Sequence, residues 1–268
     1  MVDIQARLHD HYNEALKHFK KEQILGVFYY GSANYGTNNE ESDVDTKVII
    51  IPTWEQLAFH YPPVSTTFQM PNSEEFLDCK DIREYFKQFR KQSINFLEIL
   101  FTEYKIINLD YILLWKEIVD AREEIARYNE RAAFNTIIGM AMRQMNEYKK
   151  LQFPTDEEGQ LTRMPYHESK CLYNILRLEE FLDRYAAGVS YAECLKTQKA
   201  DYLKAVKNEE YYDFETGEKI VDNAIRKMLE LEEDYIFFTN LKEKKIESLL
   251  NSVAERIIRQ SVEMEWRK

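Results

Sequence analysis

The sequence predicts an α+β chain, in which a small strand-containing half with flanking helices precedes an all-helical half. Short apolar runs at residues 24–30 and 46–51 are bounded by turn residues, as strands usually are. From Asn95 onward helical periodicity dominates and strand patterns nearly disappear. We therefore expect a first domain over residues 1–105 and a helical second domain over residues 106–268.

Composition limits the classes of protein that this chain can belong to. The 268 residues are 44% hydrophobic, which is enough for one large or two modest cores, and the net charge is −11. An acidic chain is not expected to coat duplex DNA by bulk electrostatics. Three distant cysteines (Cys79, Cys171 and Cys194) favour neither a disulfide framework nor a zinc knuckle, and no apolar run is long enough to span a membrane. We expect a cytoplasmic protein with no membrane partner.

The first half is expected to alternate helices and strands. The expected elements are an amphipathic helix at 3–22, strands at 24–30 and 46–51, a short helix at 54–59, a proline-rich edge segment at 61–73 and a strand at 74–79. Asp81 is expected to cap a helix whose buried stripe is Ile82, Tyr85, Phe86 and Phe89.

The second half is expected to contain helices joined by short polar connections. They are expected at about 96–101, 110–127, 130–150, 167–187, 190–207, 218–233 and 240–265. The longest break between them is the acidic stretch 153–165, which is bounded by proline and contains glycine.

The stretch between the first two strands carries two kinds of chemistry. Gly31-Ser32 leaves a strand where a helix can begin, and the free N–H groups of a helix start bind anions such as phosphate. Asp43 and Asp45 lie two residues apart at the start of the next strand, so both carboxylates point to the same face.

A third carboxylate, Asp78, lies on the expected strand at 74–79. Together with Asp43 and Asp45 it would form the oxygen-rich ligand set that Mg²⁺ prefers. Two such ions activate an attacking hydroxyl and stabilise a leaving pyrophosphate. Asp81 is the alternative third carboxylate, although a helix cap already gives it a role.

The string Gly31-Ser-x-x-Tyr-Gly-Thr-x-x-x-x-Ser-Asp-x-Asp45 resembles the signature of the polymerase-β-type nucleotidyltransferase superfamily. Within it, the chain is similar to the bacterial and phage group of predicted nucleotidyltransferases that includes RNA-repair-associated members. The resemblance extends through residues 63–67, 78–83 and 95–100, and more loosely into the helical half.

This resemblance implies a mixed-sheet catalytic domain and a helical domain that borders the nucleotide cleft. It implies transfer of a nucleoside monophosphate from an NTP such as ATP to a hydroxyl, with Mg²⁺ or Mn²⁺ as cofactor and pyrophosphate as product. Asp43 and Asp45 would be the paired metal ligands, and Asp78 would bridge to the attacking hydroxyl. Gly31 and Ser32 would hold the β- and γ-phosphates.

Three further residues are expected at the nucleotide. Tyr35 either stacks on it or, as we favour, packs under the loop. Lys170 and Arg177 lie seven residues apart on one helix and share a face, so they can reach a triphosphate or an acceptor phosphate. The alternative is a solvated helix face with local ion pairs.

The residues leave the hydroxyl acceptor open between an RNA end, a protein side chain and a small molecule. Two other functions are also open: a catalytically silent nucleotide-binding or regulatory module, and an antitoxin-type partner protein. The presence of all three carboxylates weighs against the silent module.

Overall fold

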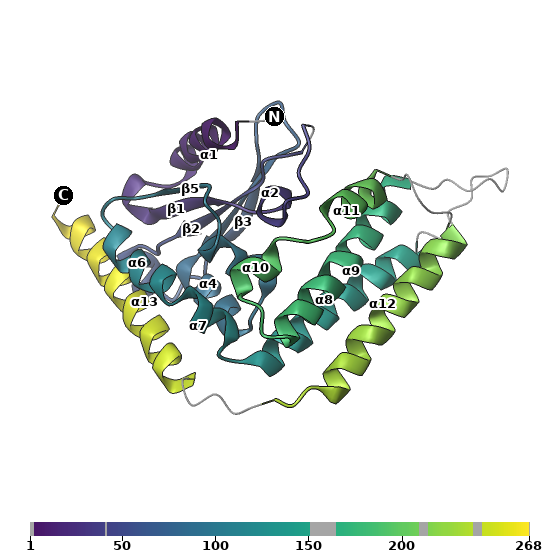
Figure 1. Cartoon of the computed structure of the whole chain (residues 1–268). Helices are drawn as coiled ribbons and strands as arrows, with labels where there is room; N and C mark the ends of the chain where they lie inside the picture. The colour runs from purple at the N-terminus through teal and green to yellow at the C-terminus, as the bar shows by residue number, and fades with distance from the viewer. Residues whose placement is uncertain (1–2, 41, 151–164, 209–213, 238–242, 268) are drawn as a thin grey trace. The chain divides into compact units, whose positions relative to one another are not determined.

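The N-terminal part of the chain folds around a mixed β-sheet in the computed structural model, which describes residues 3–40, 42–150, 165–208, 214–237 and 243–267 (Figure 1). Over these residues the sheet has five strands in the order β3-β4-β2-β1-β5. The strands are β1 (Ile24–Tyr29), β2 (Thr46–Ile50), β3 (Ser65–Gln69), β4 (Phe76–Asp81) and β5 (Lys105–Ile107). Only β2 and β4 pair in parallel, so the sheet is mixed, and the α+β prediction is confirmed.

One face of the sheet packs against α1 (Ile4–His18) (Figure 1). The apolar stripe of this helix, including Leu8 and Ala15, is buried in a cluster with Val27, Val48 and Leu77 of the sheet. Strand residues alternate between faces, so this cluster fixes which side chains of β2 and β4 point the opposite way.

The opposite face is covered by α4 (Ile82–Arg90) and α6 (Ile112–Asp120). Asp81 caps α4 by accepting the Arg83 N–H, as the sequence predicts. The predicted stripe of α4 is buried, and Trp115 of α6 lies with its ring centroid 5.3 Å from that of Phe28 on β1. The apolar part of this face is covered by these helices, and its polar side chains lie where β2 and β4 begin.

The remaining elements connect the sheet or form the helical half. The short ones are η1 (Lys21–Gln23), α2 (Ser32–Tyr35), α3 (Trp54–Ala58), α5 (Ile94–Leu97), η2 (Glu98–Leu100) and α7 (Arg122–Arg127). The later helices are α8 (Glu130–Lys150), α9 (Pro165–Ala186), α10 (Tyr191–Leu195), α11 (Ala200–Lys207), α12 (Phe214–Asp234) and α13 (Glu243–Trp266).

The chain divides into two compact units, and their limits differ from the expected boundary at 105/106. The sheet unit comprises Met1–Asn34, Asn39–Asn129 and Thr239–Lys268, and the helical unit comprises Tyr35–Asn38 and Glu130–Phe238. In this division α6, α7 and α13 belong with the sheet. The packing explains this assignment, since α13 contacts α4 and α6, and Arg256 of α13 forms a bidentate pair with Glu117 at 2.6 and 2.8 Å.

The helical unit is built around α9, which contacts α8, α10, α11 and α12. Its core is aromatic: the ring centroids of Phe181 and Tyr191 lie 5.1 Å apart, and Phe134 lies 6.3 Å from Tyr185. The helix expected at 190–207 is broken into α10 and α11. Ser190 begins α10 by accepting the Glu193 N–H, as an N-cap does.

Two further details of the expected elements are corrected. The helix expected at 110–127 is interrupted at Ala121 and forms α6 and α7. Strand β5 was not expected, because its three partly buried residues are too few to show a period of two. The proline-rich segment does contain an edge strand, β3, as expected. The break expected at 153–165 falls almost wholly outside the described residues.

Candidate functional site

Gly31 and Ser32 form the turn that follows β1. The backbone φ of Gly31 is +120°, a conformation that favours glycine. The Gly31 N–H donates to Glu98 Oε2 at 3.3 Å, and the Ala33 N–H donates to the Tyr29 hydroxyl at 2.9 Å. The turn therefore directs an amide at a carboxyl oxygen, which is an acceptor of the same kind as a phosphate oxygen.

This turn lies beside the start of β2. Strands β1 and β2 are antiparallel with Tyr29 opposite Thr46, and beyond that pair the Tyr30 N–H donates to the carbonyl oxygen of Asp45 at 3.3 Å. The structure thus brings the Gly31-Ser32 turn next to the Asp43 and Asp45 pair through backbone pairing of neighbouring strands.

The aspartates of β2 and β4 point away from α1. Val44 is buried in the cluster under α1, so Asp45 and Lys47 point to the other face. Asp43 is exposed and Asp45 is half-buried. On β4 the register pairs Asp78 with Lys47, and Asp78 lies on the same face as Asp45.

Asp78 is held by two ammonium groups. Lys80 Nζ lies 2.6 Å from Asp78 Oδ1, and Lys47 Nζ lies 3.5 Å from Asp78 Oδ2. The Lys47 side chain is buried, with its Nζ 3.7 Å from the centroid of the Tyr30 ring. Burial lowers the pKa of Lys47, while the nearby Glu98 and Asp78 carboxyl groups oppose that shift.

The arrangement fits a metal ion only in part. Among the residues that the structure describes, no group of three or more His, Cys, Asp or Glu side chains lies close enough to hold a metal ion. The Asp43 and Asp45 pair has the oxygen chemistry that suits Mg²⁺. Asp78 instead faces two lysines. The metal roles of all three aspartates stay predictions, and Asp78 can join the pair only if its lysines are displaced.

Asp81 occupies a different environment from Asp78. Its side chain is buried and accepts both the backbone N–H of Arg83, at 2.8 Å, and the Arg83 guanidinium. Asp81 also has the opposite parity along β4, so it does not share the face of Asp45. Of the two aspartates, therefore, Asp78 is the one on the face of Asp45, and its role as third carboxylate stays a prediction.

In the helical unit, Tyr35 and Arg177 pack on each other. Both side chains are buried, and the Arg177 guanidinium carbon lies 4.0 Å from the centroid of the Tyr35 ring. The Thr197 N–H donates to the carbonyl of Tyr35 at 3.1 Å. Lys170, on the same helix as Arg177, is exposed. Lys170 and Arg177 thus lie in different environments, and the nucleotide-binding roles of all three expected residues stay predictions.

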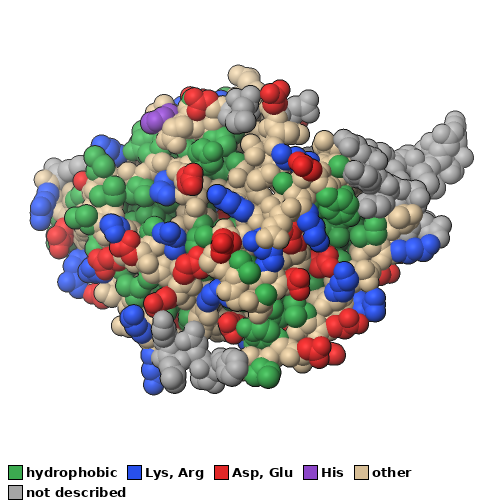
Figure 2. Space-filling model, in the orientation of Figure 1, with side chains coloured by type: hydrophobic (Ala, Val, Ile, Leu, Met, Phe, Trp, Pro, Cys, Tyr) green, Lys and Arg blue, Asp and Glu red, His purple; other side chains and the backbone are tan. Residues whose placement is uncertain are grey.

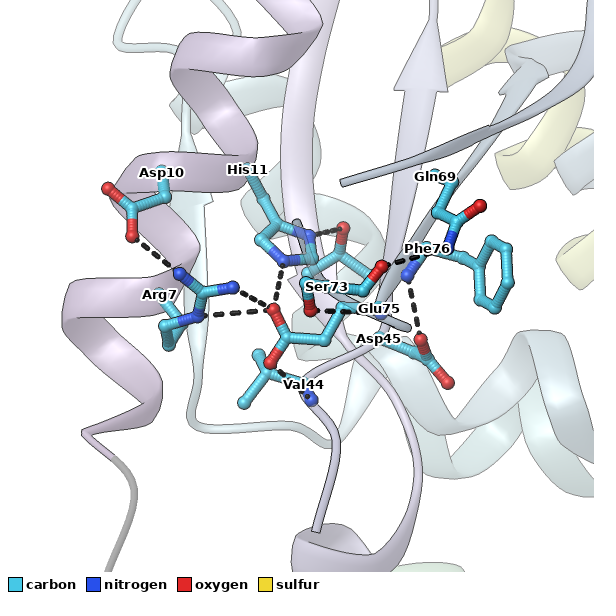
Figure 3. A network of polar contacts seen from close by, with 10 residues as sticks. Arg7, Asp10, His11, Val44, Asp45, Gln69, Ser73, Glu75 and Phe76 are labelled. Atoms are coloured by element: carbon cyan, nitrogen blue, oxygen red, sulfur yellow. Dashed lines mark hydrogen bonds and ion pairs between the residues drawn. The ribbon is translucent and has the colours of Figure 1, made fainter. Parts of the chain in front are cut away.

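A buried polar network lies on the α1 side of the same strand starts (Figure 3). Glu75 is joined there to Arg7 and His11 of α1 and to the backbone of Val44. Sequence analysis did not single out this network, nor Lys80 and Glu98. Lys80 could have been found, because residues two apart on a strand share a face.

No helix in the described part of the chain is long and apolar enough to cross a membrane.

The comparisons with known proteins identify no family for this chain. No family model and no curated protein matches it. Among solved structures, a nucleotidyltransferase-like protein from Exiguobacterium sibiricum is similar over 95% of this chain and 91% of that chain, with 12% identity and a TM-score of 0.31. Because an identity and a TM-score this low establish neither a family nor an activity, the candidate function rests on this chain's own residues.

Proposed function

We propose that this chain is a nucleotidyltransferase that transfers a nucleoside monophosphate from an NTP to a hydroxyl acceptor. The observation that carries the proposal is the backbone bond from Tyr30 to Asp45, at 3.3 Å. It joins the glycine turn, whose amide is directed at an anionic type of acceptor, to the start of the strand that carries paired carboxylates. An NTP needs both features, one for its phosphates and one for the cation that accompanies them.

The proposed reaction is an in-line displacement at the α-phosphorus. The acceptor oxygen forms a bond to this phosphorus, and the bond from the phosphorus to the oxygen that bridges to the β-phosphate breaks. Pyrophosphate leaves, and the hydroxyl proton passes to a carboxylate or to water. Positioning and charge stabilisation supply most of the acceleration of such transfers, so the chain needs no covalent nucleophile.

The chain's own residues have distinct proposed roles in this step. The Gly31 amide, which exchanges its bond to Glu98 for one to phosphate, and the Ser32 hydroxyl hold the β- and γ-phosphate oxygens. Asp43 and Asp45 hold the accompanying cation. Asp78 accepts the proton of the attacking hydroxyl. Bound Mg²⁺ or Mn²⁺ would neutralise phosphate charge and polarise the oxygens that surround it.

The acceptor is the least constrained part of the proposal. The net charge is −11, and on the face that Figure 2 shows, Lys and Arg side chains are interspersed with Asp and Glu side chains. This distribution favours a small molecule, a protein hydroxyl or an RNA end bound locally over extensive binding along a duplex.

The test is incubation with each α-³²P-labelled NTP, Mg²⁺ or Mn²⁺, and separate fractions of cellular RNA, protein and metabolites. We expect one fraction to take up label with release of pyrophosphate. The Asp45→Asn variant should transfer about 1,000-fold less label, while Glu74→Gln, which changes an exposed carboxylate nearby, should behave as wild type. Equal labelling by wild type and Asp45→Asn would overturn the proposal.

Ser32→Ala gives a separate prediction for the phosphate turn. Loss of a hydrogen bond to a charged phosphate costs about 1.5–3 kcal/mol, so the apparent NTP affinity should fall about tenfold or more. Titration with an unreactive NTP analogue measures this directly. An unchanged affinity would remove the hydroxyl from the site while leaving the backbone role intact.

A second candidate function is a catalytically silent nucleotide-binding module. The observation that favours it is the pairing of Asp78 with Lys47 and Lys80, which compensates the carboxylate that would otherwise serve catalysis. Under this alternative, NTP and Mg²⁺ raise the melting temperature, but no acceptor fraction supports pyrophosphate release.

A further inference from the structure

Two reciprocal hydrogen bonds join the chain segments that lead into β2 and β4. The Val44 N–H donates to Glu75 Oε1 at 3.1 Å, and the Phe76 N–H donates to Asp45 Oδ1 at 2.9 Å (Figure 3). The regular parallel pairing begins at the following residues, with Thr46 opposite Leu77. Side chains therefore continue the connection between the two strands into the segment that contains the aspartates.

Glu75 is itself held firmly from α1. Its Oε2 accepts from Arg7 Nε at 3.1 Å and pairs with the Arg7 Nη2 group. His11 Nε2 lies 3.3 Å from the same oxygen, and His11 Nδ1 lies 2.8 Å from the hydroxyl of Thr46. A carboxylate accepts only, so the neutral ring of His11 carries its proton on Nε2 and accepts from Thr46 at Nδ1.

Because the network is buried, the charge of Glu75 depends on its partners. Glu75 and His11 are both buried, and a buried carboxylate requires partners of this kind to remain ionised. Burial alone would raise the pKa of Glu75, but the bonds from Arg7, His11 and Val44 outweigh it and lower that pKa. The network thus holds a negatively charged acceptor against the backbone of Val44.

The position of that backbone bond is the informative feature. Val44 lies between Asp43 and Asp45, and one oxygen of Asp45 is fixed by the amide next to Glu75. Asp43 is exposed and precedes β2, so its placement depends on how the backbone at Val44 is held. Carboxylates that bind cations are commonly oriented by such hydrogen bonds from a second layer of residues.

We propose that Glu75, anchored by Arg7 and His11, is a positioning residue for the Asp43 and Asp45 pair. The inference rests on the proposed function, because it assigns Glu75 to the cation-binding part of that site. Glu75 does not contact the nucleotide. It fixes the backbone from which both carboxylates project, and Asp45 reciprocates by fixing the backbone beside Glu75.

The first test is amide hydrogen exchange, measured residue by residue by NMR on the full chain. In Glu75→Ala the Val44 amide should exchange about tenfold faster or more, since it loses its acceptor. The Val48 amide, inside β2, should be unchanged. Glu74→Ala is the matched control, because it removes a neighbouring exposed carboxylate and should alter neither amide.

The second test is binding of Mn²⁺ alone, followed by steady-state kinetics with NTP. Loss of an orienting partner typically costs about 10- to 100-fold in metal affinity or activity. Glu75→Ala should therefore weaken Mn²⁺ binding within that range and lower kcat, with a smaller change in the KM for NTP. A merely structural role would lower the melting temperature and leave the folded protein's Mn²⁺ affinity unchanged, which would overturn the inference.

Two further variants separate positioning from stability. Glu75→Gln keeps an oxygen for the Val44 N–H, and its NH₂ group can donate to His11 Nε2 if the ring proton moves to Nδ1. It should retain Val44 protection and most of the Mn²⁺ affinity while losing stability, because the ion pair with Arg7 is gone. If Glu75→Ala does not fold, the other two variants decide the matter. A Glu75→Gln protein whose Val44 amide is unprotected from exchange would contradict the inference. An Arg7→Met protein that retains the full Mn²⁺ affinity would also contradict it.

Failure of the proposed function is distinguishable from failure of this inference. Wild-type protein that binds Mn²⁺ but releases no pyrophosphate would overturn the transferase activity, while the exchange and Mn²⁺ measurements would still decide the role of Glu75. Wild-type protein that binds no Mn²⁺ would overturn the assignment of Glu75 to a cation site.

Discussion

The carboxylates at the start of β2 and the carboxylate on β4 lie on the same face of the sheet but are held in different ways. Asp45 accepts a backbone N–H, whereas Asp78 pairs with Lys47 and Lys80. A neutral amide orients a carboxylate without cancelling its charge, while an ammonium group compensates it. We therefore expect a cation to bind first to Asp43 and Asp45. Asp78 should become a ligand only when Lys47 and Lys80 move away from it.

The largest effect expected is at β2. Asp43→Asn and Asp45→Asn should each reduce NTP turnover about 1,000-fold, since each removes an anionic ligand of the cation that stabilises the transferring phosphoryl group. Circular dichroism and melting temperature should show that the Asp43→Asn fold is intact, because Asp43 is exposed. Measurement of pyrophosphate release decides the matter, and full activity in either variant would contradict the cation assignment.

Next in size is the difference between Asp78 and Asp81. Asp78→Ala should lower turnover about 100-fold, which is the usual contribution of a proton acceptor. Asp81→Ala should mainly lower stability, by about 1 kcal/mol or more, because it removes the cap of α4 and the buried partner of Arg83. Parallel assays of turnover and urea unfolding distinguish them. The reverse order would transfer the catalytic role to Asp81.

A smaller effect is expected from releasing Asp78. Lys80→Met removes the closer of its two ammonium partners and should raise Mn²⁺ affinity a few-fold, because such a partly exposed ion pair is worth about 1 kcal/mol or less. Lys87→Met, which changes an exposed lysine paired with Glu84, is the control. Unchanged or weaker Mn²⁺ binding in Lys80→Met would show that Lys80 does not compete with the cation for Asp78.

The smallest effect concerns pH and the network behind β2. Burial lowers the pKa of His11, with Glu75 opposing the shift, so the unfolded chain takes up a proton near pH 6.5 while the folded chain does so at lower pH. Stability should therefore decline as the pH falls below about 6.5, and decline further near pH 4 as the lowered pKa of Glu75 is approached. Melting temperatures from pH 7 to pH 5 should fall less steeply in His11→Gln than in wild type.

Much of the sheet unit could be predicted from local patterns. The apolar runs of β1 and β2 and the cap at Asp81 are signals that lie within a few residues. The face shared by Asp45 and Asp78 follows from the period of two once β2 and β4 are paired. These local rules were sufficient to bring the carboxylates to one side of the sheet.

The remaining features depend on tertiary packing. Glu98 reaches the Gly31 amide across 67 residues of sequence, and Glu75 meets Val44 across 31, so neither has a local signal. Likewise, the helical periodicity at 240–265 predicted a helix but did not reveal that it packs with the sheet. The limits of the two compact units differ from the expected boundary at 105/106 for the same reason.

The return of α13 to the sheet unit has consequences for how the chain folds during synthesis. Its contacts close very long loops, with Arg90 bonded to Glu247 across 157 residues and the Trp54 amide bonded to Glu265 across 211. Closing loops of this length slows folding, because their entropy is lost before the contacts form. All helices of the helical unit leave the ribosome before α13 does. The helical unit can therefore complete its core first, while the exposed sides of α4 and α6 await the helix that follows it in the sequence.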